Sequence, residues 1–380
     1  KGGGHNVAGN AVGAHGLMLD CSGMKHVQVD AERRVAVAGA GALLADLDVA
    51  TQAHGLATPL GVVSVTGIAG LTLGGGIGWL NGKHGLACDN VLAADIVTSD
   101  GRLLTASPDQ HADLYWAIRG GGGNFGVVTS FTYGLHPVGQ VLAGALSFPA
   151  ERTREVLGFY PGFAASCPDE LSMSASLGCD TSGRPVFGVG VCWSGGHDEA
   201  ALALRPLREL GPAVDVVVPT DYGAWQSAHD AGFPRGRNHY WKSSFFTDFT
   251  AGAIDVLLQF AAEMPSAASG IGMQQLHGVA ARVPPAATAF PHRRSQSELL
   301  ILAQWSDPAE TERHVGWARA FFEAMQPFAA SGVYVNDLGQ EGEERVRAAY
   351  GANYDRLAAV KAAYDPINLF RSNQNVRPTG

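Results

Sequence analysis

The chain has 380 residues, of which 46% are hydrophobic and only 16% are charged, and its net charge is −9. This length is more than one hydrophobic core usually organises, so we expect two domains. The net negative charge argues against nucleic acid as a partner, because the sequence has no basic tract that could displace counterions from phosphate groups. No apolar run approaches the length that spans a bilayer, so a membrane is not expected as a partner either.

The cysteines are few and irregularly spaced. They are too few for a disulfide framework, and no pair has the spacing of a zinc ribbon. We therefore expect reduced thiols, no metal site and a cytoplasmic protein. The chain is also expected to be a monomer or a homodimer. The cysteines are Cys21, Cys88, Cys167, Cys179 and Cys192.

The N-terminal part of the chain predicts short strands around two helices. The first helix has apolar residues at helical spacing over 43–50 and a stop at Gly55. Ser107 and Pro108 resemble a helix N-cap and first turn, which predicts a second helix running towards Ile118. A hairpin is expected about Ser99-Asp100-Gly101. The predicted strands are 17–20, 27–30, 35–38, 92–98, 103–105 and 127–133.

From about Val138 the pattern changes to strands of alternating polarity interspersed with helices. This predicts a separate antiparallel sheet backed by helices. The nearly continuous apolar run 299–305 is expected to be a buried strand of that sheet, and 284–287 is expected to be a loop. The other strands are expected at 171–177 and 186–193, and helices at 199–210, 341–350 and 354–364.

Three glycine blocks stand out in the first third of the chain. They are 2–6 (GGGHN), 66–76 (TGIAGLTLGGG) and 116–126 (WAIRGGGGNFG). A single glycine run indicates only a turn or a close backbone approach. Three such runs expose many backbone N–H groups, which suits a pyrophosphate and a flat ring system. Their spacing is not that of the G-x-G-x-x-G dinucleotide motif.

The C-terminal end carries a second set of motifs. It reads YVN at 334–336, YGAN at 350–353, YDPINLF at 364–370 and QNV at 374–376. Together with the glycine blocks, these motifs resemble the FAD-linked oxidases of the berberine bridge enzyme-like family, within the vanillyl-alcohol oxidase superfamily. The resemblance covers nearly the whole chain.

The resemblance implies an α+β fold with two domains. The FAD-binding domain would comprise 1–137 and the returning segment 331–380, and the substrate-binding domain would comprise 138–330. Family members carry a further βα segment ahead of the Gly-Gly-His loop, which implies that this chain is processed or that its beginning was not recorded.

The resemblance implies FAD as the cofactor, attached covalently through His5 only. Family members join this histidine to the 8α-methyl group of the flavin, which raises the flavin's reduction potential and prevents its loss. Many members add a second link from a cysteine in a Gly-x-Cys motif, but Val63 stands at that position and cannot form a thioether. Cys88 lies well downstream, and we interpret it as a packed thiol.

The family motifs map further expected cofactor contacts onto this chain, at Gly3, Gly4, Asn6, Gly61, Thr66, Gly67, Gly70, Leu71, Gly75, Gly76, Gly78, Gly122, Asn124, Val128, Tyr334, Asn336 and Gln374. In the plant branch of the family, the residue that aligns with Thr66 controls the access of oxygen. Valine there admits oxygen and leucine obstructs it. Because threonine is close to valine in volume, the resemblance implies O2 as the electron acceptor and hydrogen peroxide as a product, while the hydroxyl group could instead hold a water.

The family's oxidative step transfers a hydride from a C–H bond of the donor to the flavin, while a base takes the proton from an alcohol oxygen. The base is often the last tyrosine of Tyr-x-Asn-Tyr. Here Tyr334-Val335-Asn336-Asp337 places Asp337 at that position, and Ile77 replaces the family's partner tyrosine. A carboxylate can serve as a base, particularly when burial raises its pKa, although Asp337 could equally form a turn before Leu338-Gly339.

Other catalytic arrangements stay open. Tyr334 and Gln304 are further candidates at the site. His239, Tyr240, Tyr222 and His277 could also face the flavin, although buried residues of these types usually only satisfy hydrogen bonds. An amine donor has its own lone pair and needs no base. We expect Phe290-Pro291-His292-Arg293 to be a structural turn in which Arg293 pairs with a carboxylate at the domain junction.

The function expected from these motifs is the transfer of a hydride from an alcohol, sugar, amine or secondary metabolite to covalent FAD. The alternative is a flavin-free or truncated chain that acts as a binding module, because the segment that contacts the adenine side in the family is absent. Glycine blocks have little reason to persist without a cofactor, which favours the enzyme.

Overall fold

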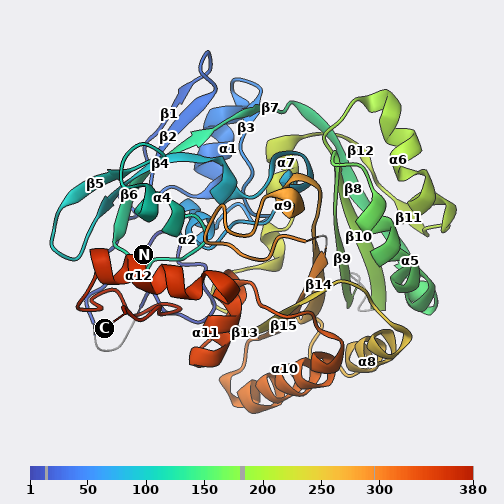
Figure 1. The fold of residues 1–380 in the computed structure, drawn as a ribbon. Coiled ribbons are helices and arrows are strands. Elements are labelled where there is room, and N and C mark those ends of the chain that lie inside the picture. Colours follow the sequence, from blue (N-terminus) through green and yellow to red (C-terminus); the bar gives the residue numbers. More distant parts are fainter. Residues whose placement is uncertain (13–15, 180–184, 295, 380) are drawn as a thin grey trace.

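The computed structural model describes residues 1–12, 16–179, 185–294 and 296–379. Two sheets organise this part of the chain (Figure 1). The first has five antiparallel strands in the order β1-β2-β6-β4-β5. Its strands are β1 (Val27–Asp30), β2 (Val35–Gly39), β4 (Val91–Val97), β5 (Leu103–Ala106) and β6 (Val127–Gly134).

Helices from both ends of the chain complete the core of the first sheet. Leu44 and Leu47 of α1 are fully buried in that core, and Tyr350 and Leu357 from the C-terminal helices join them. The chain therefore returns to its first domain at the end, as the family resemblance implied. These helices are α1 (Leu44–Gln52), α2 (Ile68–Leu73), α4 (Ala112–Ala117), α11 (Glu343–Tyr350) and α12 (Tyr354–Tyr364). The short helix α3 (Asn81–His84) contributes no residue to this core.

The second sheet has eight strands, and its main path runs β11-β8-β10-β9-β14-β15-β13, with β12 also paired to β8. One face packs against helices, as Figure 1 shows for α5, α6, α8 and α10. The strands are β8 (Gln140–Pro149), β9 (Leu171–Cys179), β10 (Pro185–Trp193), β11 (Val214–Asp215), β12 (Val218–Asp221), β13 (Asn238–Phe246), β14 (Gly270–Leu276) and β15 (Gln296–Trp305).

The helices of this part are α5 (Thr153–Ser166), α6 (His197–Glu209), α7 (Tyr222–Gln226), α8 (Ala251–Ala262), α9 (Gly278–Arg282) and α10 (Thr311–Met325). Two short strands, β3 (Leu56–Ala57) and β7 (His136–Pro137), pair with each other between the sheets. The α+β fold is confirmed. The domain boundaries expected near 137 and 330 stay a prediction, which the separate cores of the two sheets support.

Two local predictions were wrong. Residues 17–20 form no strand in the described chain, and Leu17 is 88% exposed, so its apolar pattern does not reflect pairing in a sheet. The helix expected from Ser107 begins only at Ala112. Ser107 instead closes a turn by accepting a hydrogen bond from the Gln110 backbone, and His111 adopts a left-handed conformation (φ 49°) that interrupts any helix there.

Buried ion pairs join distant segments. Arg293 donates to both carboxylate oxygens of Asp89, at 2.8 and 2.7 Å, which confirms the expected pairing at the junction of the two sheets. Lys361 donates to Asp365 and to the Asn124 carbonyl, and both side chains of this pair are completely buried. Among the described residues, no helix is long and apolar enough to cross a membrane.

Candidate active site

The first glycine block lies directly against the second. A Cβ atom on Gly3 or Gly67 would collide with the backbone of the other, so glycine is required at both positions by their mutual approach. Gly4 has a left-handed φ of 72°, and the atoms nearest to a Cβ on it would belong to the Lys1 side chain, from 3.2 Å. A Cβ atom on Gly70 would meet nothing within 4 Å outside its own helix backbone. The backbone is therefore open at these two positions, where a flat or phosphate-bearing ligand could approach.

Other glycines expected to contact the cofactor have an internal reason for their identity. A Cβ atom on Gly75 would come within 2.9 Å of the Phe290 ring, and one on Gly122 within 3.1 Å of the Tyr350 hydroxyl. The Cβ positions of Gly76 and Gly78 would meet Ala87 and the Leu60 carbonyl. Packing within the chain therefore accounts for this part of the glycine pattern.

Two expected cofactor contacts are also used within the protein. The side-chain amide of Asn124 donates to the Gly121 and Gln374 carbonyls, and its oxygen accepts from Val376. Asn124 therefore supports the third glycine block. Val128 points its side chain into the hydrophobic core of the first sheet. The cofactor contacts expected at both residues stay a prediction.

His5 faces the second sheet. Its ring lies 5.8 Å from the Phe233 ring and 6.4 Å from the Trp241 ring, measured between centroids. Burial is the main cause that lowers the pKa of His5, and nearby His239 lowers it further, against the opposing charge of Asp230. The imidazole is therefore neutral at neutral pH, which leaves a lone pair on one ring nitrogen.

Asp230 links the segment before Phe233 to the loop that follows Gly61. Its carboxylate accepts hydrogen bonds from the backbone N–H of Ser64, at 2.8 Å, and from the Ser64 hydroxyl. Leu71 packs against Gly61 on the same loop, where a Cβ atom would lie 3.1 Å from its methyl group. The sequence offered no signal for Asp230, because its partner is 166 residues away.

Successive side chains of β13 and β15 point to opposite sides of the second sheet, so the sheet has two different faces here. Ile301, Ala303 and Trp305 belong to the core beneath the helices. The other face carries His239, Trp241, Ser243 and Phe245 of β13, opposite Gln304, Leu302, Leu300 and Glu298 of β15. Because Trp241 contacts His5, this second face is the one directed towards the glycine blocks.

Gln304 lies at the end of this face nearest His5. It is buried, its amide donates to the Gly232 carbonyl at 3.4 Å, and its oxygen Oε1 has no partner among the described residues. An unpartnered buried oxygen is costly unless a ligand or water satisfies it. Gln304 therefore stays a candidate.

Tyr334 contacts the second glycine block, as expected. Its hydroxyl accepts hydrogen bonds from the Gly76 backbone, at 2.9 Å, and from Asn336, at 2.8 Å. Asn336 also donates to the Leu71 carbonyl and accepts, through its backbone, from Asn6. Burial, and then the charges of Asp337 and Glu298, raise the pKa of Tyr334, so it is a neutral phenol at neutral pH.

Asp337 follows in the single turn Val335–Asp337, which packs against β13. Burial raises the pKa of its carboxyl group, while hydrogen bonding to Glu298 opposes that rise. Glu298 is 1% exposed and was missed by sequence reasoning. The overlooked signal was a charged residue immediately before the apolar run 299–305.

The remaining candidates pack at other places, or have a lowered pKa that makes them weak bases. Tyr240 lies on the opposite face of β13, where it accepts from Arg319 at 3.1 Å. Tyr222 packs with Trp79 and Trp225, and His277 packs against Gly82. Burial lowers the pKa of His277 to about 4. Cys88 is fully buried beside Arg293, and burial raises its pKa, which fits a packed thiol.

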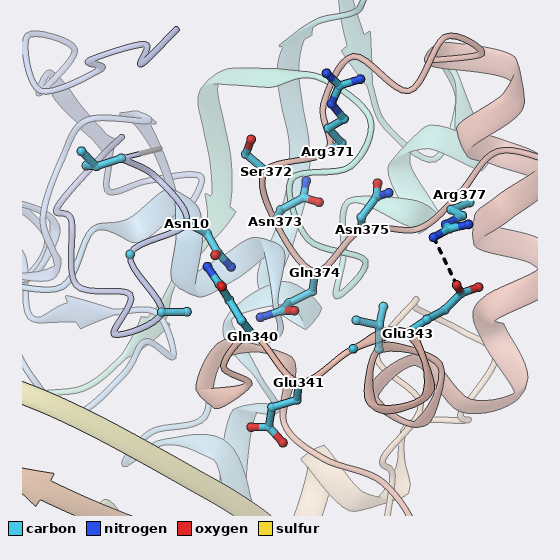
Figure 2. Close-up of a pocket in the computed structure, with 15 residues that line it drawn as sticks. Asn10, Gln340, Glu341, Glu343, Arg371, Ser372, Asn373, Gln374, Asn375 and Arg377 are labelled. Atoms are coloured by element: carbon cyan, nitrogen blue, oxygen red, sulfur yellow. Dashed lines mark ion pairs between the residues drawn. The ribbon is translucent and has the colours of Figure 1, made fainter. Parts of the chain in front are cut away.

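A polar cavity of about 690 Å³ lies between the loop after His5 and the C-terminal segment. Figure 2 shows Asn10, Gln340 and Gln374 directed towards its centre, with the ion pair of Glu343 and Arg377 at one side. Gln374 is the one expected cofactor contact that lines it, and its amide is engaged by the Leu338 and Gly339 carbonyls. No group of His, Cys, Asp or Glu in the described chain is arranged to hold a metal.

Comparison with known proteins identifies the family. The model of an FAD binding domain matches residues 1–107, and that of "Berberine and berberine like" proteins matches residues 333–377. The (R)-6-hydroxynicotine oxidase of Paenarthrobacter nicotinovorans is 32% identical over 399 residues, covering 100% of this chain and 85% of that protein. The chain belongs to the berberine bridge enzyme-like family of FAD-linked oxidoreductases.

Two further comparisons agree with this membership. An FAD-linked oxidoreductase of Dictyostelium discoideum is 30% identical over 369 residues, covering 96% of this chain and 80% of that protein. The crystal structure of 6-hydroxy-D-nicotine oxidase from Arthrobacter nicotinovorans superposes with a TM-score of 0.88 at 29% identity, covering 100% of this chain and 86% of the other. The berberine bridge enzyme-like protein described here is thus an FAD-dependent oxidoreductase acting on a small molecule.

Proposed function

We propose that this berberine bridge enzyme-like protein oxidises a C–H bond that bears a hydroxyl group, and that Asp337 takes the hydroxyl proton. The observation that carries the proposal is a carboxyl group placed beside the Tyr334 phenol, at one end of a sheet face whose other end reaches His5. FAD, when bound, supplies the acceptor for the hydride. An alcohol donor needs a proton acceptor at this position, whereas a neutral amine does not.

The residues present fit FAD. Gly4 and Gly70 leave the backbone open, and neutral His5 can form the single covalent bond. Val63 is buried where a second anchor would stand. Gln304, His239 and Trp241 each present a buried polar atom without a partner in the described chain, which would bind the donor and orient it.

The donor class can be tested directly. Anaerobic bleaching of the bound flavin would be followed with D-glucose, simple alcohols and (R)-6-hydroxynicotine as probes. Bleaching by D-glucose or by a simple alcohol would support the proposal. Bleaching by the amine alone would assign the protein to amine oxidation and remove the need for Asp337 as a base.

Attachment of the flavin through His5 alone predicts the behaviour of two variants. His5→Ala is expected to release its flavin on acid denaturation, because no second side chain can retain the ring. Cys88→Ala is the matched control and is expected to keep the flavin bound, since this thiol is fully buried. Flavin absorbance in the acid pellet and in the supernatant measures both. A cysteinyl-flavin peptide in the mass spectrum would contradict the assignment.

We also propose O2 as the electron acceptor. Thr66 is half-buried, and its backbone N–H donates to the Val63 carbonyl, which places it on the turn that carries the missing second anchor. Thr66→Leu adds volume there and is expected to slow reoxidation of the flavin in air, without slowing its anaerobic reduction. Thr66→Val, of similar volume, is the control. Wild-type enzyme that reoxidises promptly with a quinone but not in air would be a dehydrogenase.

A further inference from the structure

We propose that Glu298 is a positioning residue of the active site, a buried carboxylic acid that donates its proton in a hydrogen bond to Asp337. This hydrogen bond keeps Asp337 ionised and directed as the proton acceptor. The inference rests on the proposed function, because it assigns Glu298 a role through Asp337.

The register of the sheet places Glu298 at the required position. It pairs with Phe245 of β13 and with Gln274 of β14, so neighbouring strands enclose it on both sides. Its side chain belongs to the same face as Gln304. The turn that carries Asp337 packs against β13 and covers this end of the face.

Neither carboxyl group has a cation to neutralise it. Among the residues that the structure describes, no Lys, Arg or His forms an ion pair with Glu298 or Asp337. The nearby cations Lys242 and Arg345 are both engaged by Glu341, at 2.9 and 3.2 Å. Lys242 also lies on the other face of β13, over the Phe322 ring.

Two adjacent carboxylates without a cation cannot both ionise at moderate cost, so one retains a proton. Oε1 of Glu298 is buried without another partner, and the residue as a whole is 1% exposed. Burial, and then the charge of Asp337, raise the pKa of Glu298 well above its usual range. Asp337 is half-buried, so Glu298 is the member that holds the proton.

The shared proton explains how a half-buried aspartate can serve as a base. Burial alone would hold Asp337 protonated to a higher pH, and then it could accept nothing. The hydrogen bond from Glu298 opposes that effect. The other titratable group facing the pair is Tyr334, which stays a neutral phenol. Ser243 on β13 and Gln274 on β14 are uncharged.

The protonated acid can be observed without knowing the substrate. Infrared spectra of the FAD-loaded protein would be compared at a pH well above 7, where Asp48, whose pKa is about 7, has ionised. A carbonyl band of a buried protonated carboxyl group is expected in the wild type. Glu298→Gln should lose it, Asp337→Asn should keep it at a shifted frequency, and the exposed Glu312→Gln should leave it unchanged. A band that persists unchanged in Glu298→Gln overturns the proposal.

The pH profile of anaerobic flavin bleaching tests the role of the pair. Glu298→Leu removes the donor, so the pH at which the rate falls on the acid side should move upward. Glu298→Gln retains a hydrogen-bond donor, so the acid side of its pH profile should stay close to that of the wild type. A residue with a purely structural role would not show this rescue. The infrared spectra could show the protonated Glu298 while the flavin of Asp337→Asn is still reduced at the wild-type rate. That result would support the pair of carboxyl groups but contradict the role of Asp337 as the base. Identical profiles in Glu298→Leu and the wild type would overturn the positioning role.

Discussion

Asp337→Asn is expected to slow reduction of the bound flavin by a hydroxyl-bearing donor by about a hundred- to ten-thousand-fold, the usual loss on removing a general base. An amide cannot take the proton, and Glu298 beside it remains protonated because it is buried without a cation. Stopped-flow bleaching at saturating donor measures the effect.

The control for this variant is Glu312→Gln, which changes an exposed carboxylate on α10. Both variants should retain the wild-type amount of covalent flavin, because His5 is unaffected. The wild-type rate should fall as the pH is lowered through the raised pKa of Asp337, since protonation removes the acceptor. A variant that reduces its flavin at the wild-type rate would place the base elsewhere or make the donor an amine.

Asp48→Asn is expected to stabilise the protein at alkaline pH, by an amount that depends on pH. Asp48 is 3% exposed on α1, and its one hydrogen bond comes from Gln226 at 3.3 Å. Burial raises its pKa from 3.8 to about 7. Between these values the unfolded chain releases the proton and the folded chain keeps it, so the free energy of unfolding falls as the pH rises towards 7.

This pKa shift of Asp48 lowers the free energy of unfolding by about 4 kcal/mol once the pH exceeds the pKa of Asp48 in the folded protein. Asparagine carries no charge, so the variant should be more stable than the wild type by up to this amount at about pH 8 and similar to it at about pH 4. Urea unfolding at both pH values measures the difference. Asp109→Asn, at an exposed position, should show no such dependence. An equal difference between Asp48→Asn and the wild type at both pH values would contradict the expectation.

Local patterns predicted most of the regular structure. β1 and α12 begin and end at the expected residues, because each has a clear period and a clear stop. The two wrong predictions rested on local sequence patterns that contacts in the folded chain do not follow. The apolar residues at 17–20 have no strand to pair with in the described chain, and Ser107 closes a turn that the following left-handed His111 separates from the helix.

The site was only partly accessible from the sequence. Short motifs indicated His5, Tyr334 and Asn336, and the structure brings the last two to the second glycine block. Asp230 could not be found, because its partner Ser64 is 166 residues away in the chain. Glu298 was overlooked, and only the contact with Asp337 in the folded chain explains the charge before the apolar run. Much of the glycine pattern also reflects close packing of backbone against side chains, and the cofactor contacts expected at these glycines stay a prediction.

The two faces of β15 separate the demands of stability from those of chemistry. Substitutions at Ile301, Ala303 or Trp305 disturb a packed interior, whereas Gln304, Leu302 and Leu300 look towards the reaction space. Evolution can therefore change substrate preference along this strand at every second residue, while the residues between keep the scaffold intact. A mutational library restricted to Leu300, Leu302 and Gln304 would explore new donors at the smallest risk of unfolding.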